Sequence, residues 1–283
     1  YAAFSGNVIG TAFKQDAVRD AALGAYMGLI KQIDDQMGVL FAHLRDSGQI
    51  DNTVIVITSD HGDYLGDHWL GEKDLFHDPS VRVPMIVYDP SPEADVTRGT
   101  VSDALVESID LLPTFVDMAG GTPRYEWLEG RSLMPLIRGE TPSDWRKYTI
   151  SEYDFSITPM AGRLDLAPKD ARLFMVADDR WKFMHAEGGF PPMLFDLQND
   201  PHELNDLGRD PAYGAAVADC YDRLFEWARR SSQRTTISDQ QIDERRGKTR
   251  RKGIVLGIAD DTAADENAEI LSLYRGKARQ RFV

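Results

Sequence analysis

Residues 53–73 limit most strongly what this chain can fold into. The stretch opens with an unbroken β-branched run, 54–57 (Val-Ile-Val-Ile), then places Asp60 beside His61, and reaches Lys73 twelve residues after His61. Such a run is typical of a strand buried on both faces, as in a parallel sheet. In open α/β sheets, ligands bind beyond the carboxyl ends of the strands. A carboxylate and an imidazole at that edge are good metal ligands, and a nearby cation suits an anionic substrate.

A long helical pattern precedes this strand, and a second apolar run follows its loop. Apolar residues recur at steps of three and four over residues 18–44, with Asp16 as the expected N-cap and Gly48 as the stop. The second run, 85–88 (Met-Ile-Val-Tyr), predicts another strand of the sheet. Helix, turn and buried strand form half of a βαβ unit, whose upstream strand would come from before or near Tyr1. We therefore expect an α/β fold with a largely parallel sheet flanked by helices.

The pattern changes after residue 142. Four strand signals follow, at 148–153, 172–177, 181–185 and 193–197. A helical pattern then covers residues 211–230. Asp178-Asp179 between the second and third strand signals indicates a hairpin turn. Antiparallel strands against one helix predict a small α+β domain. We therefore divide the chain into an α/β core (1–142), a small α+β domain (143–232) and an extended C-terminal arm (233–283).

The arm has a distinctive charge pattern. Six of the eight residues from Arg245 to Lys252 are basic. Such a run is either a solvated, ion-paired segment or an arm that contacts an acidic neighbouring subunit. The second interpretation leads us to expect a homo-oligomer held together through this arm.

The composition restricts the partners. A formal charge of -14 and a pI of about 4.8 argue against nucleic acid, because duplex binding requires cationic surface. The single cysteine, Cys220, lies in a helical pattern and is expected to be a buried small hydrophobe. No apolar run approaches the roughly 18 residues of a membrane span, so we expect no membrane partner. We expect a cytoplasmic protein, although a chain that begins at Tyr1 leaves an upstream signal sequence open.

With these patterns laid out, the sequence resembles the sulfatase and phosphonate monoester hydrolase branch of the alkaline phosphatase superfamily. The motifs occur in the family's order: T-S-D-H-G-D-Y-L-G-D-H (58–68), G-E-K (71–73), R-V-P-M-I-V (82–87), I-D-L-L-P-T (109–114), E-G-R-S-L (129–133) and L-F-D-L-Q-N-D-P-H-E (194–203). They cover most of the chain up to about residue 230. Residues 28–38 are most similar to phosphonate monoester hydrolases, which also carry a long C-terminal tail. The resemblance implies an alkaline phosphatase-like core.

The resemblance also implies roles for three residues. Asp60 and His61 would be two ligands of a divalent metal, and Lys73 would contact the non-bridging oxygens of a sulfuryl or phosphoryl group. The nitrogen donor of His61 fits Mn²⁺ or Zn²⁺ better than Ca²⁺, and we expect Mn²⁺ first. The implied substrate is a small anionic ester of phosphonate, phosphate or sulfate.

One departure from the family pattern leaves alternatives open. The family's nucleophile lies in a C/S-x-P-x-R motif and is converted to formylglycine, but Cys220 is followed by Tyr-Asp-Arg and no serine fits the motif. We therefore expect the nucleophile upstream of this sequence, and this chain alone to be inactive. The alternatives are that Asp60, His61 and Lys73 are structural, and that the chain is a non-catalytic anion-binding or assembly module. For His68 and His77, packing within the loop competes with a direct catalytic role.

Overall fold

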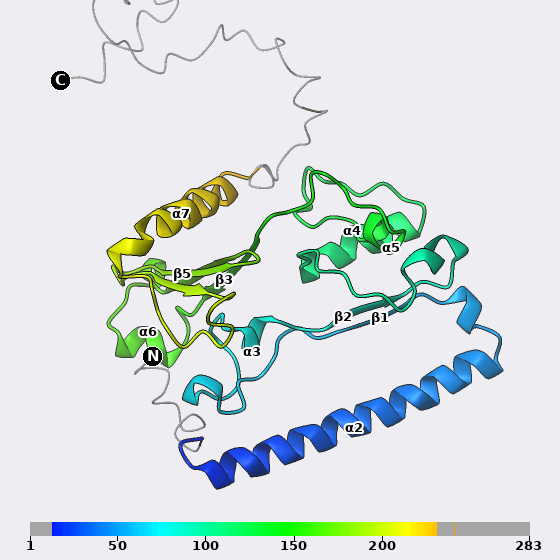
Figure 1. Cartoon of the computed structure of the whole chain (residues 1–283), viewed down its shortest axis with the longest axis horizontal. Coiled ribbons are helices and arrows are strands. Elements are labelled where there is room, and N and C mark those ends of the chain that lie inside the picture. The colour runs from blue at the N-terminus through cyan, green and yellow to red at the C-terminus, as the bar shows by residue number, and fades with distance from the viewer. Residues whose placement is uncertain (1–12, 231–240, 242–283) are drawn as a thin grey trace, which may run out of the picture. The chain divides into compact units, whose positions relative to one another are not determined.

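The computed structural model describes residues 13–230 and Gln241 (Figure 1). Its helices are α2 (Asp16–Asp46), α3 (Asp78–Val81), α4 (Leu111–Met118), α5 (Met134–Ile137), α6 (Pro159–Arg163) and α7 (Gly214–Ala228). Its strands are β1 (Ile55–Thr58), β2 (Met85–Tyr88), β3 (Thr149–Asp154), β4 (Arg172–Ala177), β5 (Trp181–Ala186) and β6 (Met193–Asp196). The predicted arm, 233–283, lies outside the described residues except for Gln241. The arm and the homo-oligomer therefore stay predictions.

The predicted long helix is present as α2, although its first residue differs from the prediction. Gln15, and not Asp16, occupies the N-cap position, and its side chain makes no capping hydrogen bond. Gly48 follows the helix with a φ of 67°, the left-handed conformation in which many helices end. Leu44 is the buried residue of α2, and four residues of the predicted apolar stripe are exposed: Tyr26, Ile30, Ile33 and Leu40. None of the described helices is both long and apolar enough to cross a membrane.

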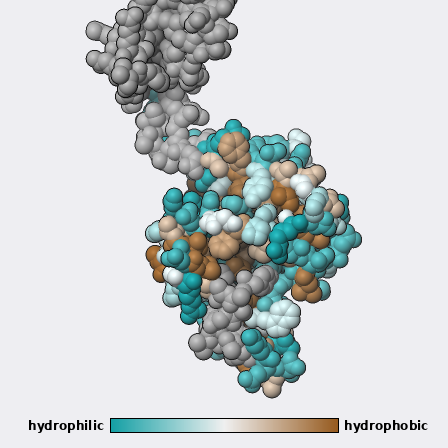
Figure 2. Space-filling model, turned by 90° about the vertical axis from the view of Figure 1, so that its left-hand side faces the viewer, coloured by the Kyte–Doolittle hydropathy of each residue, from teal (hydrophilic) through white to brown (hydrophobic). Residues whose placement is uncertain are grey.

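Exposed apolar side chains are not confined to α2. Ile86 in β2 and Phe225 in α7 are also more than half exposed. On the face drawn in Figure 2, brown hydrophobic areas lie between teal hydrophilic ones. The described part of the chain therefore does not bury all of its apolar surface by itself.

The pairing of β1 with β2 overturns the predicted fold class. The two strands are antiparallel, with Ile55 opposite Tyr88 and Thr58 opposite Met85. The other sheet of the described residues is also antiparallel, so the expectation of a largely parallel sheet is wrong for this part of an α/β chain. Parallel neighbours require a crossover connection. Here the loop 59–84 returns on itself, with Gly62 N donating to Ser80 O at 2.7 Å, so β2 begins beside the point where β1 ends.

The second sheet has the order β3-β4-β5-β6 and contains the strands expected from the sequence. The Asp178-Asp179 hairpin is present between β4 and β5, and Asp178 Oδ1 accepts from the amides of Arg180 and Trp181. The expected helix α7 follows a turn in which Asp210 accepts from Ala212 N at 2.9 Å. The domain boundary near residue 142 stays a prediction.

The sheet β3–β6 separates two apolar layers, because successive side chains of a strand point to opposite faces. On one face, Val176, Phe183 and Leu194 of the sheet pack in a cluster with Cys220 of α7. Burial raises the pKa of the Cys220 thiol to about 12, as expected of a small hydrophobe. The other face receives Phe76, from the loop between β1 and β2, among Met175, Ala177, Met184 and Phe195. The long loop is therefore part of the core of the described chain.

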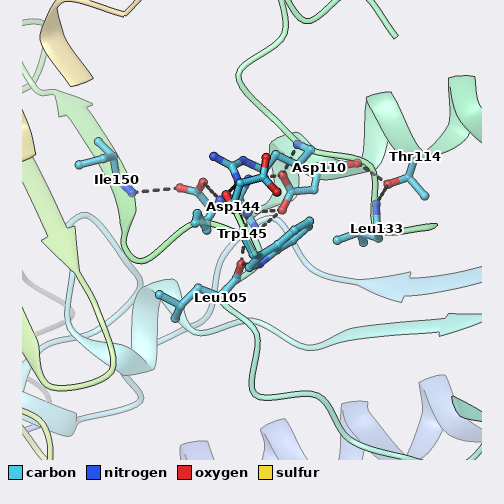
Figure 3. Close-up of polar contacts among 10 residues, drawn as sticks. Leu105, Asp110, Thr114, Leu133, Asp144, Trp145 and Ile150 are labelled. Carbon is cyan, nitrogen blue, oxygen red and sulfur yellow. Dashed lines mark hydrogen bonds and ion pairs between the residues drawn. The ribbon is translucent and has the colours of Figure 1, made fainter. Parts of the chain in front are cut away.

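A buried charge cluster connects the segment before α4 to the start of β3 (Figure 3). Asp110 is fully buried, and its carboxylate accepts two N–H bonds from the guanidinium of Arg146. The amides of Glu107 and Arg131 donate to the same carboxylate at 2.8 and 2.7 Å. Glu107 in turn accepts from Ile150 N in β3 at 3.0 Å. Segments more than thirty residues apart in sequence are thus joined through one carboxylate.

Replacing Arg146 with Met should destabilise the protein strongly, because the fully buried Asp110 and the half-buried Glu107 would lose their counter-charge. Removing one partner of a buried pair costs about 3–5 kcal/mol. Urea unfolding measures the free energy of unfolding, with Glu152→Gln as the control. Glu152 pairs with Arg172 across an exposed strand pair, and such pairs contribute about 0–1 kcal/mol. Equal losses in the two variants would contradict the importance of the buried cluster.

Candidate functional site

The end of β1 places Asp60 and His61 side by side at a locally fixed turn. Ser59 Oγ donates to the carbonyl of His61 at 2.8 Å, and His61 N donates to Asp60 Oδ1 at 3.0 Å. The Asp60 side chain is 84% exposed and that of His61 is 38% exposed. Both polar groups are therefore accessible to a ligand at the end of the strand.

The contacts of the His61 ring define its tautomer. Nδ1 lies 2.7 Å from the carbonyl oxygen of Gly62, and Nε2 lies 2.5 Å from Nζ of Lys73. A carbonyl oxygen only accepts, so Nδ1 carries the proton and Nε2 presents its lone pair. Histidines that bind metals are commonly held in this way, with the other ring nitrogen donating to a carbonyl or carboxylate. The structure thus brings His61 and Lys73 together: the Nε2 lone pair faces the Lys73 ammonium, and a metal bound at Nε2 would replace that contact.

Asp60 completes the group of three. Its Oδ2 lies 3.4 Å from His61 Nε2. Desolvation raises the pKa of the Asp60 carboxyl, but backbone hydrogen bonds, first that from the amide of His61, and the charge of Lys73 outweigh this effect, so the net shift is downward. The carboxylate is therefore ionised over the neutral range, as a metal ligand must be.

The pair fits two positions around one metal ion. Metal–ligand bonds of about 2.0–2.2 Å place neighbouring donor atoms about 3 Å apart, near the observed separation of Oδ2 and Nε2. Within residues 13–230 and Gln241, no three His, Cys, Asp or Glu side chains come together as a metal site. The described chain therefore offers two ligands, and the metal-binding role of Asp60 and His61 stays a prediction.

The loop that carries Lys73 has an unusual backbone. Five non-glycine residues have positive φ values within ten positions: Leu65, His68, Trp69, Glu72 and Asp74. Such conformations cost free energy, and they cluster at functional sites where the surroundings hold them in place. Tyr64, which is 1% exposed, supplies part of this support, because its amide donates to Glu72 O at 2.9 Å.

The two other histidines of the loop pack against each other. The rings of His68 and His77 stack with centroids 4.0 Å apart, and His77 Nδ1 lies 2.9 Å from the hydroxyl of Tyr64. His77 is fully buried, and burial lowers its pKa to about 3, with the nearby charges of His68 and Lys182 acting in the same direction. Both histidines therefore take part in packing within the loop, as one of the two alternatives predicted.

Sequence reasoning missed a buried ionic cluster that fastens this loop to the second sheet. Lys182 Nζ contacts Asp78 and lies 2.8 Å from Glu203 Oε1, and Asp78 N donates to Glu203 Oε2 at 2.6 Å. The Lys182–Glu203 contact is an ion pair without hydrogen-bond geometry at Oε1. The available signal was a lysine inside the apolar strand 181–186 (Trp-Lys-Phe-Met-His-Ala). A cavity of about 320 Å³ borders this cluster, and Asp60, His61 and Lys73 do not line it.

Two protein-family models match this chain. A family model described as Sulfatase matches residues 5–121, and one described as N-sulphoglucosamine sulphohydrolase, C-terminal, matches residues 66–230. The chain belongs to the sulfatase family. The resemblance to this part of the alkaline phosphatase superfamily is thereby confirmed.

Individual relatives agree with this placement. The Multifunctional alkaline phosphatase superfamily protein PehA of Trinickia caryophylli is 38% identical over 74% of this chain and 41% of its own length. An arylsulfatase of Clostridium perfringens is 34% identical over 68% of this chain and 37% of its own length. The solved phosphonate monoester hydrolase SpPMH from Silicibacter pomeroyi is 34% identical, with a TM-score of 0.68 over 76% of this chain and 43% of that one. The chain thus spans about two fifths of the length of the relatives it matches.

Replacing Gly62 with Ala should disturb the site directly. A Cβ at this position would lie 2.0 Å from the carbonyl oxygen of Pro79, so the loop ends must separate and the bond from Gly62 N to Ser80 O must weaken. Overpacking of this kind costs about 1–3 kcal/mol. Hydrogen exchange at the Gly62 amide and urea unfolding measure the effect. Gly38→Ala is the matched control, because nothing lies within 4 Å of its Cβ, and equal behaviour of the two variants would contradict the close approach.

The buried His77 predicts a dependence of stability on pH. Its folded-state pKa of about 3 lies below that of an unfolded histidine, so the unfolded state binds a proton first and stability falls as the pH drops from about 6.5 towards 3. Between pH 7 and pH 5, this residue should lower the free energy of unfolding by about 2 kcal/mol. Urea unfolding of the wild type and of His77→Gln at both pH values measures it. The variant should lose less stability between them, and identical pH dependence would contradict the assignment.

Proposed function

We propose that this chain forms one side of the active site of a metal-dependent hydrolase of phosphonate, phosphate or sulfate esters. The observation that carries the proposal is the convergence of Asp60, His61 and Lys73 at the end of β1, with the tautomer of His61 suited to a metal. Family membership supports the reaction class, and the local geometry supports the roles of these three residues.

The donor set favours Mn²⁺ as the cofactor, followed by Zn²⁺ or Ca²⁺. Asp60 offers a hard oxygen and His61 a borderline nitrogen, a mixture that suits first-row divalent ions better than Ca²⁺. A bound divalent ion supplies positive charge to the oxygens of the transferred group. Asp60 and His61 would hold it from this side, and the remaining ligands and the formylglycine-type nucleophile would come from outside this sequence.

Lys73 is proposed to bind the small anionic substrate. Its ammonium lies at the same edge as the two ligands, on a loop that is held rigidly by Tyr64 and by packing of Phe76. Sulfuryl and phosphoryl transfer depends mainly on positioning and on stabilising the charge of the equatorial oxygens. An ammonium already at this edge would stabilise that charge after exchanging its contact with His61 Nε2 for the substrate oxygens.

The test is turnover of aryl phosphonate, phosphate and sulfate esters by the full-length gene product with Mn²⁺. Lys73→Ala should lower kcat/KM by about 10²–10³-fold, because a preorganised charge contact to the reacting group is lost. Asp60→Asn should raise the Mn²⁺ concentration needed for activity. Lys169→Ala is the control, since this lysine is exposed on a turn of the second sheet's domain.

The runner-up is a non-catalytic anion-binding or assembly module, favoured by the absence of the C/S-x-P-x-R motif from this sequence. Turnover of none of the three ester classes by the full-length protein, with the nucleophile matured, would reject the enzyme. Retained binding of inorganic sulfate or phosphate that depends on Lys73 would then support the module.

A further inference from the structure

Two charged residues of the second sheet and its following loop are almost completely buried beneath the candidate site's loop. Lys182 is 1% exposed and Glu203 is 2% exposed. They meet Asp78, which is 104 residues from Lys182 and 125 residues from Glu203 in sequence. The contact therefore connects the first turn of α3 to distant parts of the chain.

This contact holds a helix that is too short to be stable alone. α3 comprises four residues, and an isolated helix of this length does not form in water. Glu203 accepts from the amide of Asp78, one of the N-terminal N–H groups that lack a partner within the helix. Lys182 binds the side chain of the same residue. The position of α3 is thus set by the ionic cluster.

From α3 an unbroken series of contacts reaches His61. The carbonyl of Ser80 accepts from Gly62 N at 2.7 Å, and the carbonyl of Pro79 lies so close to Gly62 that no Cβ fits between them. The carbonyl of Gly62 then accepts from Nδ1 of His61 at 2.7 Å. Displacement of α3 would therefore move the acceptor that orients the imidazole ring.

The ionic composition of the cluster agrees with a role in geometry. Desolvation raises the pKa of Glu203, and the charge of Lys182 and the amide of Asp78 oppose that shift. Buried ion pairs contribute little net stability compared with apolar residues of similar volume, so net stabilisation does not account for the charges of this cluster. An apolar contact between the loop and the sheet is already present through Phe76, so the charges are not required merely to bury the loop.

We propose that Lys182 and Glu203 are positioning residues that act through α3 and Gly62 to hold the ring of His61 with Nε2 presented to the metal. The effect on catalysis rests on the proposed function, whereas the orientation of the ring does not. Neither residue touches the reacting groups, and their influence passes through the backbone of the loop.

The first experiment observes the ring of His61 in the full-length protein. Selective ¹⁵N-histidine labelling and NMR, with His61→Gln for assignment, report which ring nitrogen is protonated at a fixed pH of 8 without added metal. The wild type should show the Nδ1–H tautomer. Glu203→Gln and Lys182→Met should shift His61 towards a mixture of tautomers.

Asp196→Asn is the matched control, because Asp196 is a buried carboxylate of the same sheet, paired with Arg180 at 2.9 Å. It should leave the His61 signals unchanged at a similar loss of stability. If Lys182→Met fails to fold, the double variant Lys182→Met with Glu203→Met keeps the volume without buried charge, and it should fold and still show the mixture.

The second experiment measures the dissociation constant of Mn²⁺ alone. Glu203→Gln should weaken binding by about 10-fold or more, in the range found for residues that orient metal ligands, while Asp196→Asn stays within about 2-fold of wild type. Unchanged His61 tautomer and Mn²⁺ affinity in Glu203→Gln and in the folded Lys182 variant, or equal changes in Asp196→Asn, would overturn the proposal. Lack of ester turnover by the wild type would reject the proposed function only, because the NMR measurement still decides the positioning.

Discussion

Asp78 fastens the loop between β1 and β2 to the four-stranded sheet through its contacts with the buried ion pair of Lys182 and Glu203. The loop carries five left-handed non-glycine residues, so its conformation costs free energy and does not persist by itself. Phe76 supplies apolar burial against the sheet, and the charges supply direction. Together they allow an irregular segment to hold His61 and Lys73 at a fixed distance.

Two buried charge clusters connect segments that are distant in sequence. Asp110 and Arg146 tie the segment before α4 to β3, and Lys182 and Glu203 tie α3 to β5. In each cluster, backbone amides donate to the carboxylates, which offsets the cost of taking charge out of water. The apolar layers on both faces of β3–β6 provide burial that is less directional. Charges therefore fix how segments meet where continuous secondary structure is short.

The elements could be predicted from the sequence better than their pairing could. The run 54–57 and the hairpin at Asp178-Asp179 identified strands, because side-chain pattern and turn chemistry are local properties. The direction in which β1 pairs is not a local property, because it depends on how the loop 59–84 folds back. In the structure, Gly62 bonds Ser80 and Asp78 bonds Glu203 within that fold. Asp60, His61 and Lys73 were found through motif spacing and do converge. Glu203 entered only as the last residue of the 194–203 motif, and its contact with Asp78 was not predicted.

The antiparallel pairing that contradicts the expected sheet also explains how the candidate site is closed. Because Thr58, the last residue of β1, lies opposite Met85, the first residue of β2, the long loop starts and finishes at the same end of the strand pair. The entropy lost in closing a loop grows slowly with its length, so the ladder needs to supply only a modest stabilisation. The bond from Gly62 to Ser80 continues the closure beyond the strands, next to His61. In a parallel arrangement, the loop would start and finish at opposite ends of the two strands. The bond from Gly62 to Ser80 would then be lost, and with it the position of the Gly62 carbonyl that orients His61.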